Sequence, residues 1–276
     1  MTDWLGVCLE ATAAVCEELR GLPTRLEREP RVGAGVGGDE TTAIDYAAER
    51  AIVRRLEALH RDGVDFTLVS EELGERRYGD GADALRIVVD PIDGSVNAKR
   101  GMPFFAVSIA VAEGVAMRDV VFGFVLDLGT GEEWTARRGE GAFLNGEPLA
   151  GPGPKDPIEI LDFEATTTAL VAEQAPAILG FAHRLRVMGS LALSLCHLAA
   201  GRVDAVCSLK PCRSVDVAAA QLLVRERGLA LELPDAPPFD AAPLDLAGRS
   251  RIIAGSTSEM CAELARRLAG AAPVVP

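Results

Sequence analysis

The chain has 276 residues, and 49% of them are apolar, which is enough for one large or two small domains with a substantial core. The formal net charge of −13 argues against a nucleic-acid partner, because a phosphate backbone would be repelled over most of the surface. No apolar run is long enough to span a membrane, and the N-terminus has neither a basic region nor a cleavage site, so we expect a cytoplasmic protein without a membrane partner.

The first half of the chain predicts helices and then a series of antiparallel strands. Apolar residues recur at helical spacing over the first 22 residues and again over residues 42–60. The Asn-Gly of "LNGEPL" is typical of a tight hairpin. Strands are expected at 64–70, 85–90, 104–114, 119–128 and 132–138. We therefore expect an antiparallel meander in the middle of the chain.

The second half alternates strands and helices after a linker, "GPGPKDP", at 151–157. Alternation of this kind is typical of α/β architecture. We expect two subdomains, residues 1–150 and 151–276, in one compact unit with a ligand at their interface. Strands are expected at 158–163, 184–188, 203–209 and 251–255, and helices at 166–179, 190–200, 216–227 and the C-terminal end.

Cysteine and histidine offer little for a zinc site or a Ser-His-Asp triad. The six cysteines form no CxxC pair, and several lie in apolar runs, so buried free thiols are expected rather than disulfides. The chain has three histidines; His60 ends a predicted helix and His197 lies in an apolar one, where a structural role is the commoner one.

A more informative stretch covers residues 88–105, "VVDPIDGSVNAKRGMPFF". A strand is expected to deliver Asp90 to its C-terminal end, Pro91 to end the strand, and the turn to bring Asp93 back beside Asp90. Gly94 permits a tight backbone, and Ser95 begins a helical turn whose free N–H groups point at an anion. Two carboxylates held this close repel each other unless a cation shares them, although two solvated aspartates in an ordinary turn would give the same pattern.

Further carboxylates are expected at the ends of other elements. Glu71 and Glu72 follow the strand predicted at 64–70, and Asp216 precedes an apolar helix. Each has an ordinary explanation, as an acidic residue in a first helical turn or as an N-cap. Together with Asp90 and Asp93, however, they supply the oxygen ligands that hard divalent cations prefer.

Several segments together resemble the inositol monophosphatase superfamily: "SEE", "DPIDGSVNAKRGMPFFAVSIAV", "MGSLALSLCHLAAGRVDA" and "SVDVAAAQLLVRERG". Two more, "GAGVGGDETTAIDYAAE" and "NAKRGMPFF", look most like its archaeal branch, whose members hydrolyse inositol monophosphate and fructose 1,6-bisphosphate. The resemblance runs from about residue 33 to the last helix. It implies a layered αβαβα sandwich of the α/β class with an α+β first half, and a Mg²⁺-dependent phosphatase of sugar or polyol phosphates that forms homodimers.

The resemblance also implies a metal site, formed mostly by the first subdomain and completed by the second. Glu71, Asp90 and the carbonyl of Ile92 match ligands of one ion, and Asp90, Asp93 and Asp216 match ligands of another. A third ion usually shares Asp93, Asp216 or waters near Glu71. Two to three Mg²⁺ ions are therefore expected, with Mn²⁺ able to replace them and Li⁺ as an inhibitor.

The residues that act on the substrate follow from the same resemblance. Ser95 and Asp45 match a hydroxyl–carboxylate pair that, with Glu71, orients the attacking water. From the residues alone, Asp45 looks like a mid-helix surface residue. The positions that match phosphate or substrate contacts are Asp93, Gly94, Ser95, Arg186, Leu191 and Lys210.

Some positions depart from the family pattern. Serine stands at Ser95 where threonine is commoner, which keeps the hydroxyl. Leu191 replaces a small residue, so a narrower substrate pocket is expected. Lys210 stands where archaeal relatives tend to have arginine, and its spacing to Asp216 is one residue short, so Arg213 is a rival for its role.

Other functions fit parts of the pattern. A 3′(2′),5′-bisphosphate nucleotidase shares the metal motif and differs in the substrate pocket. A non-catalytic metal- or phosphate-binding regulator on the same scaffold would need no turnover, but the complete carboxylate set argues against a decayed site. A prenyl-diphosphate enzyme with a DxxD motif would need a mostly helical chain, which the strands expected at 104–138 contradict.

Overall fold

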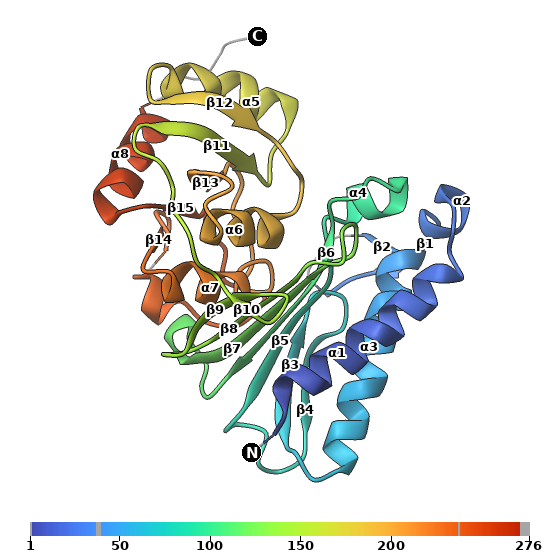
Figure 1. Ribbon diagram of the computed structural model, residues 1–276. Coiled ribbons are helices and arrows are strands. Elements are labelled where there is room, and N and C mark those ends of the chain that lie inside the picture. The colour runs from blue at the N-terminus through green and yellow to red at the C-terminus, as the bar shows by residue number, and fades with distance from the viewer. Residues whose placement is uncertain (1, 37–39, 237, 271–276) are drawn as a thin grey trace.

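The computed structural model describes residues 2–36, 40–236 and 238–270. Helices and sheets alternate in five layers, the αβαβα order that the resemblance implies (Figure 1). The helices are α1 (Trp4–Arg20), α2 (Arg25–Arg28), α3 (Ala43–Arg61), α4 (Ser95–Arg100), α5 (Thr168–Gln174), α6 (Leu191–Ala199), α7 (Ala220–Glu226) and α8 (Ser258–Ala269), with short 3₁₀ turns at Met117–Asp119, Ala175–Ile178 and Phe239–Ala241.

The larger sheet has eight strands in the order β10-β9-β8-β7-β6-β5-β3-β4. Neighbouring strands are antiparallel except β3 and β5, which are parallel, so the expected meander is confirmed from β5 to β10. Strand β4 was not expected. The bounds are β3 (Phe66–Ser70), β4 (Gly74–Tyr78), β5 (Arg86–Asp93), β6 (Ala106–Ala112), β7 (Val120–Asp127), β8 (Glu133–Arg137), β9 (Gly141–Leu144) and β10 (Glu147–Pro148).

The smaller sheet has five strands in the order β12-β11-β13-β15-β14. Strands β12, β11 and β13 run parallel, as strand–helix alternation predicts, and β15 is antiparallel to both of its neighbours. The bounds are β11 (Ile158–Glu164), β12 (Ala182–Arg186), β13 (Ala205–Ser208), β14 (Ala230–Glu232) and β15 (Ile253–Gly255). A separate hairpin joins β1 (Arg31–Ala34) to β2 (Glu40–Thr42), and residues 37–39 of the segment that looks archaeal lie outside the described residues.

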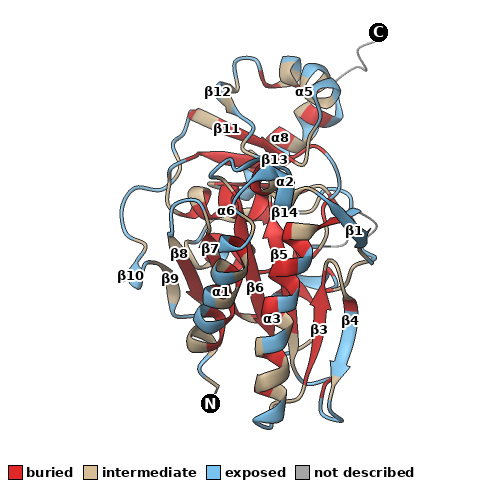
Figure 2. Cartoon of the chain, turned by 90° about the vertical axis from the view of Figure 1, so that its right-hand side faces the viewer, coloured by how far each residue is buried: buried red, intermediate tan, exposed pale blue. Residues whose placement is uncertain are grey.

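Burial follows from the layering. Strand β6 is buried along its whole length (Figure 2). Its side chains alternate between two cores. Val107, Ile109 and Val111 pack with α1 and α3, whereas the small Ala106 and Ala110 face the layer of α6 and α7. Small side chains on that face allow the helices to approach the sheet closely. Helix α6 carries apolar residues all round, as a helix between two sheets requires.

The sequence and the structure differ at several element ends. The helix expected at 216–227 begins at Ala220, because the preceding turn is tighter: the Val217 N–H bonds to the Ser214 carbonyl, three residues back. The helix expected at 166–179 divides into α5 and a 3₁₀ turn at Ala175–Ile178. The strand expected at 184–188 is β12, which begins and ends two residues earlier.

One simpler expectation, that of free cysteine thiols, is confirmed. All six cysteines are free, and five of them are buried. No helix within the described ranges is both long and apolar enough to cross a membrane. The two sheets are built from residues on either side of the 151–157 linker, although the division into two subdomains stays a prediction.

Candidate active site

A cavity of about 690 Å³ is lined by residues from both halves of the chain, and this volume suits a small-molecule ligand. The first half contributes β2, the start of α3, the ends of β3 and β5, and α4. The second half contributes residues 164–166, 187–191 and 212–216. The acidic residues in its wall are Glu40, Asp45, Glu71, Glu72, Asp90, Asp93, Glu164 and Asp216, and the basic ones that the structure describes there are Lys99 and Arg213.

Strand β5 carries the two aspartates of the DPIDG run into this cavity. Pro91 does not end the pairing with β6 as expected. Instead, Asp90 pairs with Ser108 and Asp93 with Ala106, so one extra residue is accommodated in β5 between them. A bulge of this kind re-aims side chains, and it leaves both carboxylates buried at the cavity wall.

The acid cluster consists of Glu71, Asp90 and Asp216, whose nearest carboxylate oxygens all lie within 4.8 Å of one another. Glu71 directly follows β3, and β3 runs parallel to β5, so the carboxyl ends of the two strands meet here. Asp216 arrives from the second half, on the turn before α7. Burial, and then the negative charge of Glu71, raises the pKa of Asp90 well above its ordinary value.

Asp93 joins the two halves of the protein across the cavity. Its Oδ2 accepts hydrogen bonds from the Ser190 hydroxyl at 2.5 Å and from the Ala192 N–H at 2.7 Å, at the start of α6. Burial raises the pKa of Asp93 to about 7 despite these donors, and the charge of Asp216 adds to the effect. A cation beside Asp93 would counter that shift.

Arg213 lies at the edge of the acid cluster. Its Nη2 is 2.7 Å from Glu71 Oε1, and its backbone N–H donates to Asp216 Oδ2 at 2.7 Å. The single positive charge of Arg213 does not balance the negative charges of the three cluster carboxylates and of Asp93. The cluster therefore fits divalent cations, which take carboxylate oxygens as ligands.

Ser95 and Asp45 touch, although fifty residues separate them. Ser95 Oγ lies 2.8 Å from Asp45 Oδ1 and 2.9 Å from the carbonyl of Ile92. The expectation that Asp45 is a surface residue is wrong: it is buried in the first turn of α3, where Oδ2 accepts from the Thr42 N–H at 3.0 Å as part of a capping box. The cap holds the carboxylate in place and leaves Oδ1 for Ser95.

Gly94 is required where α4 begins. Its φ is +91°, and a Cβ there would lie 2.9 Å from the carbonyl oxygen of Gly189. Asn97 holds the same junction, because its Nδ2 donates to the carbonyls of Phe104 and Met188, each at 2.8 Å. The cavity wall is therefore closed by close contact between α4 and the 188–189 segment.

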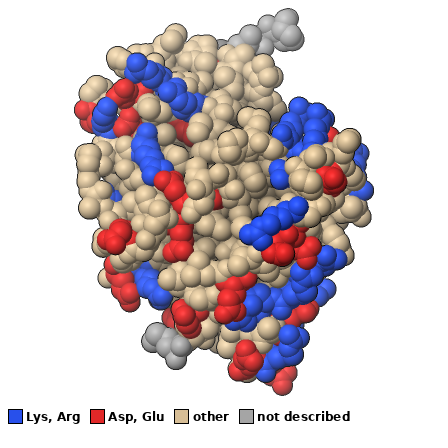
Figure 3. Space-filling model, turned by 45° about the vertical axis from the view of Figure 1, so that its right-hand side comes forward, with Lys and Arg blue, Asp and Glu red and all other residues tan. Residues whose placement is uncertain are grey.

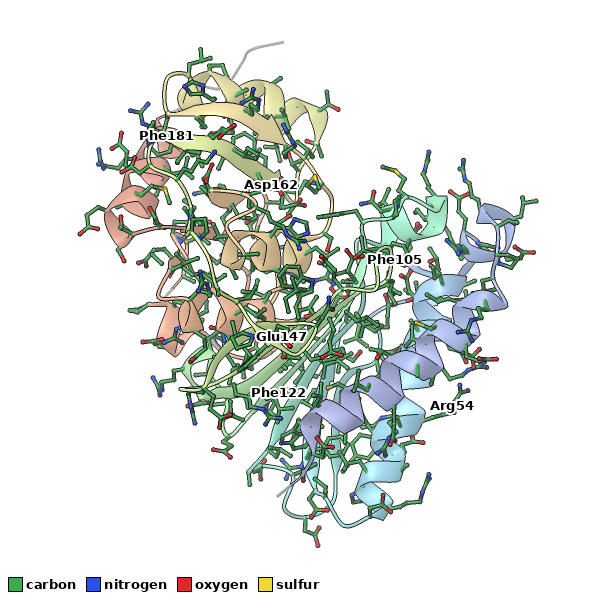
Figure 4. All side chains as sticks on the ribbon, viewed as in Figure 1. Arg54, Phe105, Phe122, Glu147, Asp162 and Phe181 are labelled. Atoms are coloured by element: carbon green, nitrogen blue, oxygen red, sulfur yellow. The ribbon has the colours of Figure 1, made fainter. Side chains whose placement is uncertain are left out.

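Sequence reasoning missed a second group of acids, Asp162 and Glu164 on β11; Asp162 is labelled in Figure 4. Both are buried, and the Ser194 hydroxyl lies 2.7 Å from Asp162 Oδ2 and 3.0 Å from Glu164 Oε1. Glu164 also accepts from the N–H groups of Met188 and Gly189, at 3.1 and 2.9 Å. Burial, and then Asp162, raises the pKa of Glu164 to about 8. The signal was present as two acids two residues apart on one face of β11, beside the buried Leu161 and Phe163.

The residues expected to contact substrate lie in different places. Leu191 lines the cavity, as do Gly94 and Arg213. Arg186 and Lys210 are exposed and are not among the described residues of the cavity wall. For these two, a substrate contact stays a prediction.

The chain resembles known proteins along nearly its whole length. A family model described as the inositol monophosphatase family matches residues 6–271. A fructose-1,6-bisphosphatase/inositol-1-monophosphatase of Methanothermobacter thermautotrophicus is 31% identical over 93% of each chain. A Nus factor SuhB of Pasteurella multocida is 36% identical over 69% of this chain and 70% of its own. A solved Pyrococcus horikoshii protein, described as hypothetical with similarities to inositol-1 monophosphatase, is 26% identical with a TM-score of 0.79, covering 96% of this chain and 97% of that one.

Proposed function

Since the chain belongs to the inositol monophosphatase family of phosphatases, we infer that it is a Mg²⁺-dependent enzyme that hydrolyses phosphate monoesters of sugars or polyols, inositol 1-phosphate and fructose 1,6-bisphosphate among them. The observation that carries this proposal is the acid cluster of Glu71, Asp90 and Asp216 in the wall of a cavity of suitable size. Relatives whose names include both activities supply the two substrates.

The acid cluster fits the Mg²⁺ ions that membership of the family implies. Glu71, Asp90, Asp93, Asp216 and the carbonyl of Ile92 would hold two or three Mg²⁺ ions, because all five donors are oxygens. When bound, these ions supply neutralisation of phosphoryl charge and activation of water. Burial of Asp90 and Asp93 in the absence of a cation costs free energy, so cation binding would also stabilise the fold.

The chain's own groups would position the reactants. Ser95, held by Asp45 at 2.8 Å, would orient the attacking water together with Glu71. Asp45 would accept a hydrogen bond from the Ser95 hydroxyl and so keep that hydroxyl in one orientation. Backbone N–H groups at Gly94 and Ser95 would bind the phosphate, and Leu191 would limit the width of the sugar pocket. Catalysis by positioning and by charge stabilisation is sufficient for phosphoryl transfer.

Two alternatives remain as outcomes of the test. A nucleotide bisphosphatase would use the same acids with a different pocket preference. A non-catalytic regulator would bind cations without turnover, and the relatives named Nus factor SuhB show that family members carry names other than phosphatase. The expected homodimer stays a prediction, which size-exclusion chromatography with light scattering would check.

Phosphate release from inositol 1-phosphate, fructose 1,6-bisphosphate and adenosine 3′,5′-bisphosphate tests the proposal. We expect turnover of the first two with added Mg²⁺ and none after the purified protein is stripped with EDTA. Full turnover in EDTA would contradict metal dependence. Preferred hydrolysis of the adenosine compound would favour the nucleotidase, and no turnover of any substrate would favour the regulator.

A further inference from the structure

Lys99 occupies a distinctive position in the cavity. It lies on α4 four residues after Ser95, so the two side chains lie on the same face of the helix, about 6 Å apart along its axis. Both line the cavity, and so does Val96 between them, whose side chain is exposed. One end of α4 therefore adjoins the acid cluster and the other end presents a cation.

The charge around the cavity makes that cation significant. The described wall contains eight acidic residues and two basic ones, Lys99 and Arg213. Arg213 lies 2.7 Å from Glu71 at the acid cluster, whereas no ion pair is found for Lys99 within the described part of the chain. In Figure 3 several basic side chains gather at the upper right, where α2 and α4 lie.

A bisphosphate has an electrostatic difficulty in this cavity. Its reacting phosphate would be neutralised by the cations proposed at the acid cluster. The second phosphate, at the other end of the sugar, would face the carboxylates of the cavity wall without such cations beside them. A lysine one helical turn beyond Ser95 removes this difficulty, because its flexible stem carries a compact positive charge toward the far end of the cavity.

We propose that Lys99 is a specificity-determining residue that binds the second, non-reacting phosphate of sugar bisphosphate substrates. This inference rests on the proposed phosphatase function and adds to it the recognition of a second anionic group. It also differs from the sequence expectation, which gave the substrate-contacting cations as Arg186 and Lys210. Both of those side chains are exposed outside the described cavity wall.

The test compares two substrates that differ only in the second phosphate, fructose 1,6-bisphosphate and fructose 1-phosphate. Lys99→Ala should raise KM for the bisphosphate about tenfold or more, as expected for a lost charge-assisted hydrogen bond, and should change KM for the monophosphate less than about twofold. Lys99→Arg should restore most of the affinity, because it keeps the charge. The effect should shrink as ionic strength rises.

Arg100→Ala is the matched control, because it removes the same charge from the next residue of α4, which is exposed and lies outside the described wall. It should leave both KM values near wild type, and melting curves should show both alanine variants folded. Equal effects of Lys99→Ala on the two substrates, or a bisphosphate defect in Lys210→Ala but not in Lys99→Ala, would overturn the inference. A wild-type enzyme that hydrolyses inositol 1-phosphate but no bisphosphate would overturn the inference and leave the phosphatase proposal standing, whereas no phosphatase activity at all would overturn both.

Discussion

Two groups of carboxylates, the acid cluster and the pair on β11, lie at the same cavity or directly beside it, and their surroundings differ. In the acid cluster of Glu71, Asp90 and Asp216, the nearest carboxylate oxygens lie within 4.8 Å of one another, although Arg213 and the Ile92 N–H also donate to the cluster. On β11, Asp162 and Glu164 are also close, but a serine hydroxyl and two backbone N–H groups donate to them. Burial raises carboxyl pKa values in both places. We infer that the first group is suited to cations, whereas the second is held by hydrogen bonds and protonation, with Asp162 Oδ1 as the one oxygen of the pair that has no hydrogen-bond partner among the described residues.

Neutralising one member of the acid cluster should have the largest effect. Asp90→Asn removes one charge and a proposed ligand oxygen, while its remaining oxygen can still accept from the Ile92 N–H, as Oδ1 does now at 3.0 Å. We expect kcat with Mg²⁺ to fall at least about a hundredfold. In EDTA, however, the variant should melt above wild type, because repulsion within the cluster is reduced.

A thermal-shift titration with Mg²⁺ completes that test. Wild type should gain stability with added Mg²⁺ by mass action, and Asp90→Asn should gain much less. A wild-type protein whose melting temperature is the same in EDTA and in millimolar Mg²⁺ would show that the acid cluster does not need a cation, and the contrast between the two groups would then be lost.

The pair of Ser95 and Asp45 should show the next largest effect. If they act as one unit beside the acid cluster, Ser95→Ala and Asp45→Asn should each lower kcat about a hundredfold with little change in KM. The double variant should cost much less than the product of the two single losses. Steady-state kinetics give the cycle, and melting curves control for loss of the α3 cap. Strictly multiplicative losses in kcat would contradict a shared role.

The sequence predicted the acid cluster better than it predicted Asp45 and Glu164, the carboxylates that accept hydrogen bonds from other parts of the chain. Asp90, Asp93 and Glu71 were found because it is unusual for several predicted strands of one chain to end in acidic residues. Asp45 was found only through resemblance, since its first-turn capping is invisible before the helix start is known. Glu164 was missed because an acid at a strand end is ordinarily solvated, and its donors come from residues 188–194, which only the tertiary fold brings near.

The fold was predictable to a similar depth. Alternating strands and helices predicted the α/β character of the second half, because hydrophobic periodicity is a local property, whereas the layered αβαβα order came from the family resemblance. Strand β4 was missed because its exposed charged residues give no apolar alternation. The start of α7 was placed four residues early, because the tight turn at Ser214 has the same apolar spacing as the helix after it.

The serines beside the two groups provide a more graded test. Ser190 donates to Asp93, and Ser194 donates to the pair on β11. Each alanine variant should lose about 1–3 kcal/mol of unfolding free energy, since a buried carboxylate loses one of its hydrogen-bond donors. Only Ser190→Ala should also raise the Mg²⁺ concentration for half-maximal activity. An equal shift of Mg²⁺ dependence in Ser194→Ala would mean that the two groups act as one.

The smallest expected effect on activity concerns the proton on Glu164, which acts on stability alone. Its pKa rises from an ordinary 4.5 to about 8 on folding, chiefly through burial. Between these values the folded protein holds a proton that the unfolded chain has released, so this residue makes stability fall as pH rises from about 4.5 to about 8. Glu164→Gln keeps an acceptor for the Gly189 N–H and removes the titration. The melting temperature of Glu164→Gln minus that of wild type should therefore rise by a few degrees between pH 5 and pH 8.5 and stay constant above that range.

Glu113→Gln, at an exposed residue, is the control, and its melting temperature relative to wild type should show no such rise. A difference between Glu164→Gln and wild type that stays constant with pH would mean that Glu164 is ionised in the folded protein, and the distinction between a cation-binding and a proton-holding group would fail.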